Sequence, residues 1–305
     1  MAMEAIAAEG QVGDIAQDHW DEMFAAPKAA TWHSNPLVAA EIGRRLGTDT
    51  HWLFWVFQQK LRVRPRRLLS IGCGDGSHEL ILSRNGLAEY VEAFDLSGVG
   101  ISKAQEAVAE ENLNAQFYQS SFDEFVSRPH DVPFDAVMFV GSLHHVRDLE
   151  GMLSKVRRIL TEDGVLIYNE YVGPCYIILP DEQVAIVNNV IAAIPPEYKH
   201  SPEVHWINPT IEVVLDGDPS ESVRSALIRP FLRMYFDVAW ETGFGGALLH
   251  PLFQMLHGDK LADDSPGSRA VVGLCIEIEN ALMRAGLLQD DFCIGVAHPR
   301  RASGD

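Results

Sequence analysis

Apolar residues in the middle of the chain fall into two patterns: short continuous runs, and longer stretches with apolar positions three or four residues apart. A short run is typical of a strand covered on both faces, and the wider spacing is typical of a helix with one buried face. The runs predict five strands, at residues 67–71, 90–95, 115–119, 134–140 and 165–169. The spacing predicts helices between them, at residues 77–84, 97–111 and 149–160. Because strands and helices alternate, we expect an α/β fold with a parallel, doubly wound sheet.

The two ends of the chain are predicted to be mainly helical. Before residue 63, helices are expected at residues 20–24, 35–46 and 51–60. After residue 172, helices are expected at residues 184–194, from residue 218, at 247–257 and at 269–285, with strands at 234–240 and 292–297. The two late strands complete a seven-stranded, mainly parallel sheet. The sequence is therefore divided into an N-terminal helical cover (1–62), a Rossmann-like core (63–172), a helical lid or substrate insertion (173–232) and a C-terminal segment that completes the core (233–305).

Charge and cysteine use narrow the range of partners. The 305 residues include 24 basic and 43 acidic side chains, a net charge of −19. This charge argues against a nucleic-acid partner, because a phosphate backbone is bound by clustered Lys and Arg. No apolar run approaches the length of a bilayer span, and the N-terminal sequence lacks the pattern of a secretory signal. The four cysteines form no C-x-x-C pair. These features predict a cytoplasmic protein with reduced thiols and no membrane partner.

A glycine-rich turn follows the first strand of the predicted core. Residues 72–76 read Gly-Cys-Gly-Asp-Gly, and a helix is predicted to begin at Ser77. Glycine adopts positive φ without strain and lets a ligand approach the backbone, while a helix start offers unpaired N–H groups. The next strand ends at Asp95, at the spacing from which a carboxylate reaches ribose hydroxyls. The two features together indicate a nucleoside cofactor.

The order of residues in this turn discriminates among nucleoside cofactors. A phosphate-binding loop would carry a Lys that is missing here, and the third glycine of a dinucleotide-binding turn is replaced by Ser77. The compressed Gly-x-Gly-x-Gly form resembles motif I of the class I S-adenosylmethionine-dependent methyltransferases. Residues 134–146 and 156–167 are similar to later motifs of the small-molecule branch of that family. Further segments resemble a subgroup associated with bacterial glycan and natural-product pathways; they are residues 32–38, 169–174, 218–225 and 245–250.

The resemblance implies S-adenosyl-L-methionine as the cofactor and a small molecule, sugar or peptide-like compound as the methyl acceptor. It implies that the cofactor's methionine part lies over the glycine turn and its ribose at Asp95. The residues to which it assigns cofactor binding are Ser70, Gly72, Cys73, Gly74, Asp95, Leu96, Ser121, Phe122 and Gly141. Two of these positions depart from the family pattern, since Ser70 and Ser121 stand where the family often has an acid.

Candidate catalytic residues follow the fourth and fifth predicted strands. His144 and His145 lie just beyond residue 140, at the edge of the sheet where open α/β folds bind ligands. Either imidazole could take a proton from a hydroxyl acceptor, because its pKa lies near neutrality. Glu170 ends the next strand and could orient a histidine. The sequence thus predicts these three residues as the catalytic group.

Three further residues are predicted to bind the acceptor. They are Tyr171, Arg224 and His250. Arg224 is the candidate for holding a carboxylate or phosphate, because guanidinium binds such groups bidentately. No metal is expected, because the histidines show neither an H-x-x-x-H nor an H-E-x-x-H pattern. The apolar late helices leave room for a homodimer interface.

Three hypotheses about function stay open at this point. The first is O-methylation by in-line displacement, with a histidine as the base. The second is a cofactor-binding enzyme that uses the sulfonium only as an electrostatic element, in a cyclisation or elimination. The third is a non-catalytic partner protein that has kept the nucleoside pocket.

Overall fold

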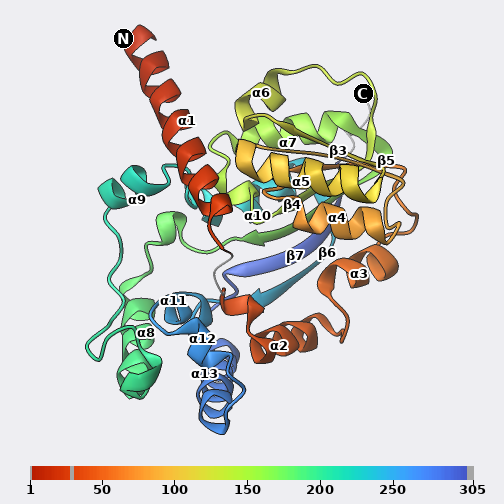
Figure 1. Ribbon diagram of the computed structural model, residues 1–305. Helices are drawn as coiled ribbons and strands as arrows, with labels where there is room; N and C mark the ends of the chain where they lie inside the picture. The colour runs from red at the N-terminus through yellow and green to blue at the C-terminus, as the bar shows by residue number, and fades with distance from the viewer. Residues whose placement is uncertain (1, 28–30, 301–305) are drawn as a thin grey trace.

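A seven-stranded sheet organises the protein, as the computed structural model in Figure 1 shows; it describes residues 2–27 and 31–300, with side chains from residue 13 onward. The strands are β1 (Arg67–Ile71), β2 (Tyr90–Asp95), β3 (Ala115–Gln119), β4 (Phe134–Val140), β5 (Leu160–Tyr171), β6 (Phe236–Gly245) and β7 (Phe292–Pro299). Their spatial order is β3-β2-β1-β4-β5-β7-β6, and β7 runs antiparallel to both of its neighbours. The predicted α/β fold with a mainly parallel sheet is therefore confirmed.

Helices cover both faces of the sheet, as the continuous apolar strands require. The core helices are α4 (Ser77–Arg84), α5 (Gly98–Glu111), α6 (Phe122–Ser127) and α7 (Leu149–Ile159). Neighbouring residues of β1 serve different cores: Leu68 packs in one hydrophobic cluster, and Leu69 packs in another together with the buried face of α7. Each fully buried Leu contributes about 1.5–3 kcal/mol to folding.

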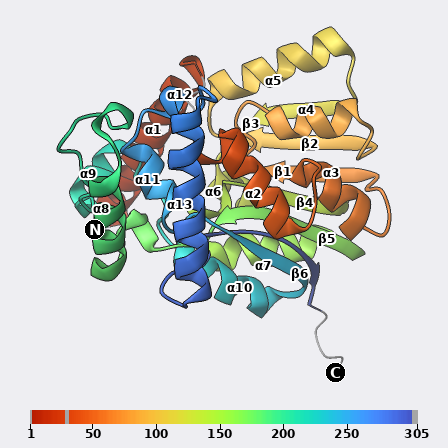
Figure 2. The same ribbon diagram turned by 90° about the horizontal axis from the view of Figure 1, so that it is seen from below.

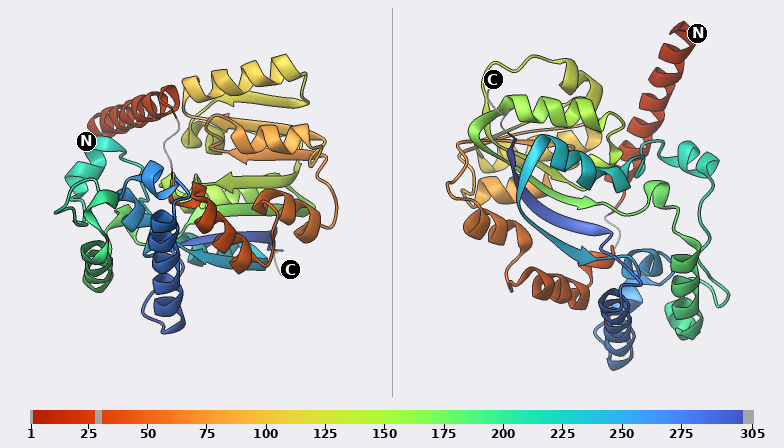
Figure 3. Two further views of the ribbon diagram at one scale, coloured as in Figure 1. Left: turned by 60° about the horizontal axis from the view of Figure 1, so that its bottom comes forward. Right: turned by 180° about the vertical axis from the view of Figure 1, so that it is seen from behind.

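The first helix of the N-terminal cover begins earlier than the sequence predicted. Helix α1 (Ala2–Ala25) starts well before residue 20, and it is followed by η1 (Trp32–Ser34), α2 (Pro36–Leu46), α3 (Trp52–Trp55) and the π-helical turn η2 (Val56–Lys60). The end of α1 lies beside the start of α5 (Figure 3). There the Asp21 carboxylate accepts hydrogen bonds from the Ser97 hydroxyl at 2.5 Å and the Val99 amide at 3.0 Å. These bonds fix α1 against the nucleoside-binding half of the sheet.

The segment after β5 is helical, but its helices are not all where the sequence placed them. They are η4 (Cys175–Ile177), α8 (Asp181–Ala193), η5 (Pro196–Tyr198), α9 (Ile211–Gly217), η6 (Ser225–Leu227), α10 (Ile228–Tyr235), α11 (Leu249–Gln254), α12 (Gly258–Leu261) and α13 (Pro266–Arg284). The helix expected from residue 218 is wrong: Asp218 Oδ1 accepts hydrogen bonds from the Ser220 amide at 2.8 Å and hydroxyl at 2.6 Å, which closes a turn instead. The predicted boundary at residue 232 falls within α10.

The cover and the C-terminal segment are joined by a buried ion-pair network. Arg45 of α2 donates to Glu41 at 2.9 Å, to Glu279 of α13 at 3.1 Å and to Asn280 at 2.8 Å. Figure 2 shows α2 and α13 side by side at this contact. Removing one partner of such a pair leaves an uncompensated charge and costs about 3–5 kcal/mol.

The carboxyl ends of the parallel strands meet along one edge of the sheet. Ile71, Asp95 and Val140 are the last residues of β1, β2 and β4, and Tyr171 is the last residue of β5. Open α/β folds bind ligands beyond this edge. None of the helices described is both long enough and apolar enough to cross a membrane.

Candidate active site

The glycine turn forms the floor of a pocket of about 580 Å³ at this edge. Gly72, Gly74 and Gly76 all have positive φ, at 71°, 57° and 72°. A Cβ on Gly74 would lie 2.5 Å from the Phe24 ring, and one on Gly72 would lie 2.6 Å from the Ser142 Cβ. The turn therefore requires glycine for its backbone shape and for the close approach of its neighbours.

Asp95 is held firmly at the side of this pocket. Its Oδ2 accepts a hydrogen bond from the Gly74 amide at 2.7 Å, and its Oδ1 accepts one from the Ser97 amide at 2.9 Å. Burial raises the pKa of Asp95, and the backbone hydrogen bonds act in the opposite direction. Each carboxylate oxygen keeps a lone pair for a further donor, so the residue is suited to accept two ribose hydroxyls.

Eight of the nine predicted cofactor-binding residues line this pocket. They are Gly72, Cys73, Gly74, Asp95, Leu96, Ser121, Phe122 and Gly141. Ser70 lies outside this lining: it is buried in β1, and its hydroxyl donates to Glu79 of α4 at 2.6 Å. Ser121 also has a structural role, since its Oγ caps α6 by accepting from the Glu124 amide at 3.2 Å.

Helix α1 closes the pocket from outside. Trp20 and Phe24 both line it, and their rings stack with centroids 5.9 Å apart. The Trp20 ring also meets the His145 ring edge-on at 5.1 Å. The sequence showed Trp20 only as the start of a short helix, and no local pattern relates it to a strand end more than a hundred residues away.

A second cavity of about 1100 Å³ adjoins the first. It lies between the N-terminal cover and the ends of β4, β5, β6 and β7. Val140, Gly141 and His78 line both spaces. Gly141 has a φ of 60°, and a Cβ built on it would meet no atom within 4 Å. The structure thus places two adjoining spaces on either side of the end of β4; we call the first the donor pocket and the second the acceptor cavity.

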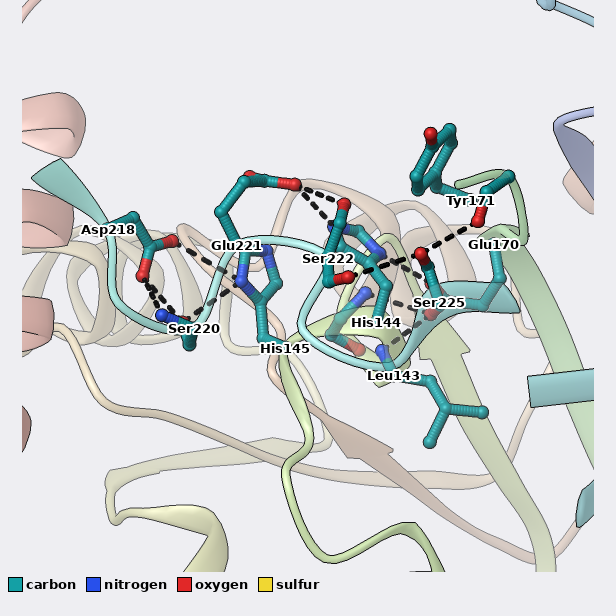
Figure 4. Close-up of polar contacts among 12 residues, drawn as sticks. Leu143, His144, His145, Glu170, Tyr171, Asp218, Ser220, Glu221, Ser222 and Ser225 are labelled. Carbon is teal, nitrogen blue, oxygen red and sulfur yellow. Dashed lines mark hydrogen bonds and ion pairs between the residues drawn. The ribbon is translucent and has the colours of Figure 1, made fainter. Parts of the chain in front are cut away.

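The 3₁₀ turn η3 (Leu143–His145) separates the two histidines between these spaces. His144 lines the acceptor cavity, whereas His145 lines the donor pocket. The His144 Nδ1 lies 2.8 Å from Glu170 Oε2, and Glu170 Oε1 accepts hydrogen bonds from the amides of Ser142 at 2.8 Å and Leu143 at 2.7 Å. Figure 4 shows Glu170 beside this turn. Glu170 therefore holds both the turn and the imidazole, and it leaves His144 Nε2 as the nitrogen available to the acceptor cavity.

His145 is held by the turn that sequence analysis had assigned to a helix. Its Nδ1 lies 3.1 Å from the Ser220 hydroxyl and 3.3 Å from Asp218 Oδ2, as Figure 4 shows. Burial opposes ionisation of Asp218, but the hydrogen bond and charge of His145 lower the pKa of Asp218 to about 2. This carboxylate is therefore ionised at neutral pH and orients His145 beneath Trp20.

The charges around His144 favour its protonated form. Burial lowers its pKa, but the hydrogen bond and charge of Glu170, with the charges of Glu221 and Asp218, produce a net increase above the ordinary value. Glu221 Oε1 lies 4.0 Å from His144 Nε2. His144 is thus a base with a pKa raised above that of free histidine, which is the direction that strengthens proton acceptance.

The three residues predicted to bind the acceptor have different positions. Tyr171 lines the acceptor cavity, and its hydroxyl donates to the Pro174 carbonyl at 3.1 Å. His250 lies behind the wall, with its ring 5.8 Å from that of Tyr171 and 5.3 Å from that of Phe292, and burial lowers its pKa to about 4. Arg224 lines neither space: it forms a bidentate pair with Glu150 at 2.5 and 2.9 Å. The geometry therefore gives Arg224 a structural partner in place of an anionic acceptor.

One group of side chains in the described part of the chain has the composition of a metal site. His144, His145 and Glu221 each offer a ligand atom, and these atoms lie within 4.8 Å of one another. The sequence analysis expected no metal, and it did not bring Glu221 to the histidines. That expectation stays a prediction.

Comparisons with known proteins agree with this geometry. Residues 68–164 match the family model of a methyltransferase domain. An uncharacterized methyltransferase of Mycobacterium tuberculosis is 31% identical over 107 residues, which cover 35% of this chain and 51% of that protein. A ubiquinone biosynthesis O-methyltransferase of Actinobacillus pleuropneumoniae is 25% identical over 120 residues, which cover 38% of this chain and 50% of that protein. The chain therefore spans about half the length of the curated relatives it matches.

A solved structure extends the likeness in fold to almost the whole chain. Geranyl diphosphate C-methyltransferase from Streptomyces coelicolor A3(2) superposes with a TM-score of 0.54 at 14% identity, over 95% of this chain and 98% of that protein. The Rossmann-like sheet, the glycine turn and Asp95 define a protein that binds a nucleoside cofactor. The family match then indicates the class: residues 68–164 match a methyltransferase domain, and S-adenosylmethionine is the cofactor that this likeness indicates.

Proposed function

We propose that this protein transfers a methyl group from S-adenosylmethionine to a hydroxyl group of a small molecule bound in the acceptor cavity. The observation that carries the proposal is the His144–Glu170 pair at 2.8 Å, because it presents an imidazole to this cavity beside Gly141, where the two spaces adjoin. A hydroxyl is a weak nucleophile until a base removes its proton, and a histidine held by a carboxylate is suited to that step.

The donor pocket fits the proposed cofactor. Positive-φ glycines open the floor beneath the bound molecule, and Asp95 offers two fixed oxygens to ribose hydroxyls. Phe122 and Trp20 supply apolar wall, and α1 shields the site from water. When bound, S-adenosylmethionine supplies a methyl group that is already activated as part of a sulfonium. The protein therefore has to align the two molecules and exclude water.

His144 has the chemical role in this scheme. Its Nε2 accepts the proton of the acceptor hydroxyl, and Glu170 stabilises the resulting imidazolium through Nδ1. Glu170 is part of neither cavity lining but contacts His144, so it acts as a positioning residue that fixes the tautomer of His144. The similarity to a ubiquinone biosynthesis O-methyltransferase supports oxygen as the methylated atom, over the 38% of this chain that the similarity covers.

The test is to incubate the protein with S-adenosylmethionine carrying a CD₃ methyl group and a panel of hydroxylated compounds. We expect equal amounts of S-adenosylhomocysteine and a product heavier by one CD₃ in place of one hydrogen. Product that forms without S-adenosylhomocysteine would favour the alternative in which the sulfonium is not consumed. Failure to bind S-adenosylmethionine in calorimetry would favour a non-catalytic partner protein.

A further inference from the structure

The acceptor cavity is large and includes several aromatic rings in its wall. Its volume of about 1100 Å³ is at the upper end of typical small-molecule sites, which are about 300–1000 Å³. Four aromatic rings contribute to its wall, and they are those of Trp52, Tyr171, Phe244 and Phe292. Aliphatic residues such as Leu46, Val140 and Ile294 fill the spaces between them. A ligand that fills this space gains most of its binding free energy from apolar contact.

Permanent charge is confined to the mouth of the cavity. Among the described lining residues, Arg44 and Asp49 carry a permanent charge, and both are exposed. Arg44 is already paired, since its guanidinium donates to the two carboxylate oxygens of Glu41 at 2.7 and 2.6 Å. The cavity therefore offers no unpaired permanent cation at depth to a phosphate or carboxylate.

Two histidines of the wall, His33 and His51, favour the neutral form. Desolvation lowers the pKa of His33 and that of His51, so both rings favour the neutral form. His144 does carry positive charge when protonated, but Glu170 neutralises it at 2.8 Å, and the proposed base must be neutral to act. An anionic ligand would consequently lose its hydration without a compensating partner.

Polar groups that could orient a ligand gather at one end of the cavity. His144, the Asn169 side chain and the Tyr171 hydroxyl oxygen lie near the ends of β4 and β5, beside Gly141. The rings of Phe244 and Phe292 line the same cavity, and the Phe292 ring lies 5.1 Å from that of Tyr171. This arrangement suits a mainly apolar molecule that carries a hydroxyl. It does not suit a free sugar, whose many hydroxyls would each need a partner.

We propose that the acceptor is an uncharged, largely apolar ring compound of two or more rings that presents one hydroxyl to His144. This inference rests on the proposed function for the role of the hydroxyl, and on the lining of the cavity for the rest of the molecule. It excludes phosphorylated and carboxylated acceptors as preferred ligands.

Two probes with the same nucleophile and different charge test this proposal. They are 2-naphthol and 6-hydroxy-2-naphthoate, each titrated into the protein saturated with S-adenosylhomocysteine, with Kd measured by calorimetry at pH 7.5. We expect 2-naphthol to bind at least tenfold more tightly than the naphthoate, and methyl glucoside to bind more weakly than 2-naphthol. Equal or tighter binding of the naphthoate, or of the glucoside, would overturn the proposal.

A matched pair of variants assigns the preference to this cavity. Trp52 lines the cavity, whereas Trp55, three residues later, packs on Trp240 outside the lining. We expect Trp52→Ala to weaken 2-naphthol binding several-fold and Trp55→Ala to leave it unchanged. Equal effects of the two variants would contradict the assignment. Turnover is measured separately with the CD₃ donor: if 2-naphthol binds as expected but is not methylated, the proposed function fails while the ligand class stands.

Discussion

The donor pocket and the acceptor cavity lie side by side, yet the chain builds them in different ways. Most of the donor pocket comes from segments close together in sequence, in which a strand leads into a turn and the backbone makes many of the contacts. The acceptor cavity is assembled from side chains of α2, α3, β5, β6 and β7, which are up to about 260 residues apart in sequence. A family of related enzymes can thus keep its donor while changing its acceptor, because side chains on separate segments vary independently of the glycine turn.

The largest expected effect is a loss of kcat on substitution of His144, which the neighbouring His145 should not share. We expect His144→Ala to reduce kcat by about 10²–10⁴-fold, because a general base contributes about that factor. The Kd for S-adenosylmethionine should stay within about twofold, because His144 is not in the lining of the donor pocket. His145→Ala is the matched control: it should raise that Kd and retain most of kcat. If His145→Ala reduces kcat more than His144→Ala does, the roles assigned to the two residues are wrong.

A large effect is also expected at Asp95. Asp95→Ala removes the acceptor of the Gly74 and Ser97 amides as well as the two oxygens that face the pocket. A hydrogen bond to a charged group is worth about 1.5–3 kcal/mol, which corresponds to a loss of about 10–150-fold in affinity for S-adenosylmethionine. Calorimetry measures this loss, and binding of 2-naphthol serves as the control that should not change. Unchanged affinity for the cofactor would show that Asp95 does not bind it.

The pH dependence of turnover tests the pair formed by His144 and Glu170. The base must be neutral, so kcat/KM should fall about tenfold per pH unit below the pKa of His144. This pKa is raised by Glu170, so the midpoint of the acid limb should lie above the ordinary value of 6.5. Glu170→Gln removes the charge that raises it, and we expect a lower kcat together with a midpoint at lower pH. An acid limb at the same pH in this variant would mean that another group titrates.

The smallest effect is expected at Trp20 of helix α1, which closes the donor pocket. Trp20→Ala removes one stacked and one edge-on ring contact, to Phe24 and His145. Aromatic pairs contribute about 0.5–1.5 kcal/mol, so the Kd for S-adenosylmethionine should rise about two- to twelvefold. The KM for the acceptor should not change, because Trp20 does not line that cavity. If Trp20→Ala changed only the KM for the acceptor, the assignment of Trp20 to the donor pocket would be wrong.

Much of the donor side could be predicted from sequence because local patterns determine it. The bounds of β1 to β4 match the predicted strands, and eight of nine predicted residues line the donor pocket. Ser70 is the exception. The family pattern assigns cofactor binding to its position. In this chain the Ser70 hydroxyl donates to Glu79 instead, and Glu79 belongs to none of the sequence motifs. Burial raises the pKa of Glu79 to about 7, so this pair belongs to the core beneath the turn.

The acceptor side could not be predicted in the same way, because its residues meet only through tertiary contacts. The side chains of residues 218–224 are compatible with a helix. In the structure one carboxylate oxygen of Asp218 instead closes an Asx turn, and its other oxygen contacts His145. The guanidinium of Arg224 is a group that can bind an anion, but in the structure it is already paired with the carboxylate of Glu150 in α7. Trp52 and Trp55 lie in the same predicted helix at residues 51–60, and only the position of Trp52 against the cavity, at the start of α3, distinguishes it from Trp55.

A crystal structure with S-adenosylhomocysteine and 2-naphthol would test the central claim most directly. We predict that the naphthol oxygen lies within about 3.2 Å of His144 Nε2 and faces the donor pocket beside Gly141, with the rings against Trp52 and Phe292. A naphthol oxygen bound away from His144, or a ligand held outside this cavity, would contradict the account.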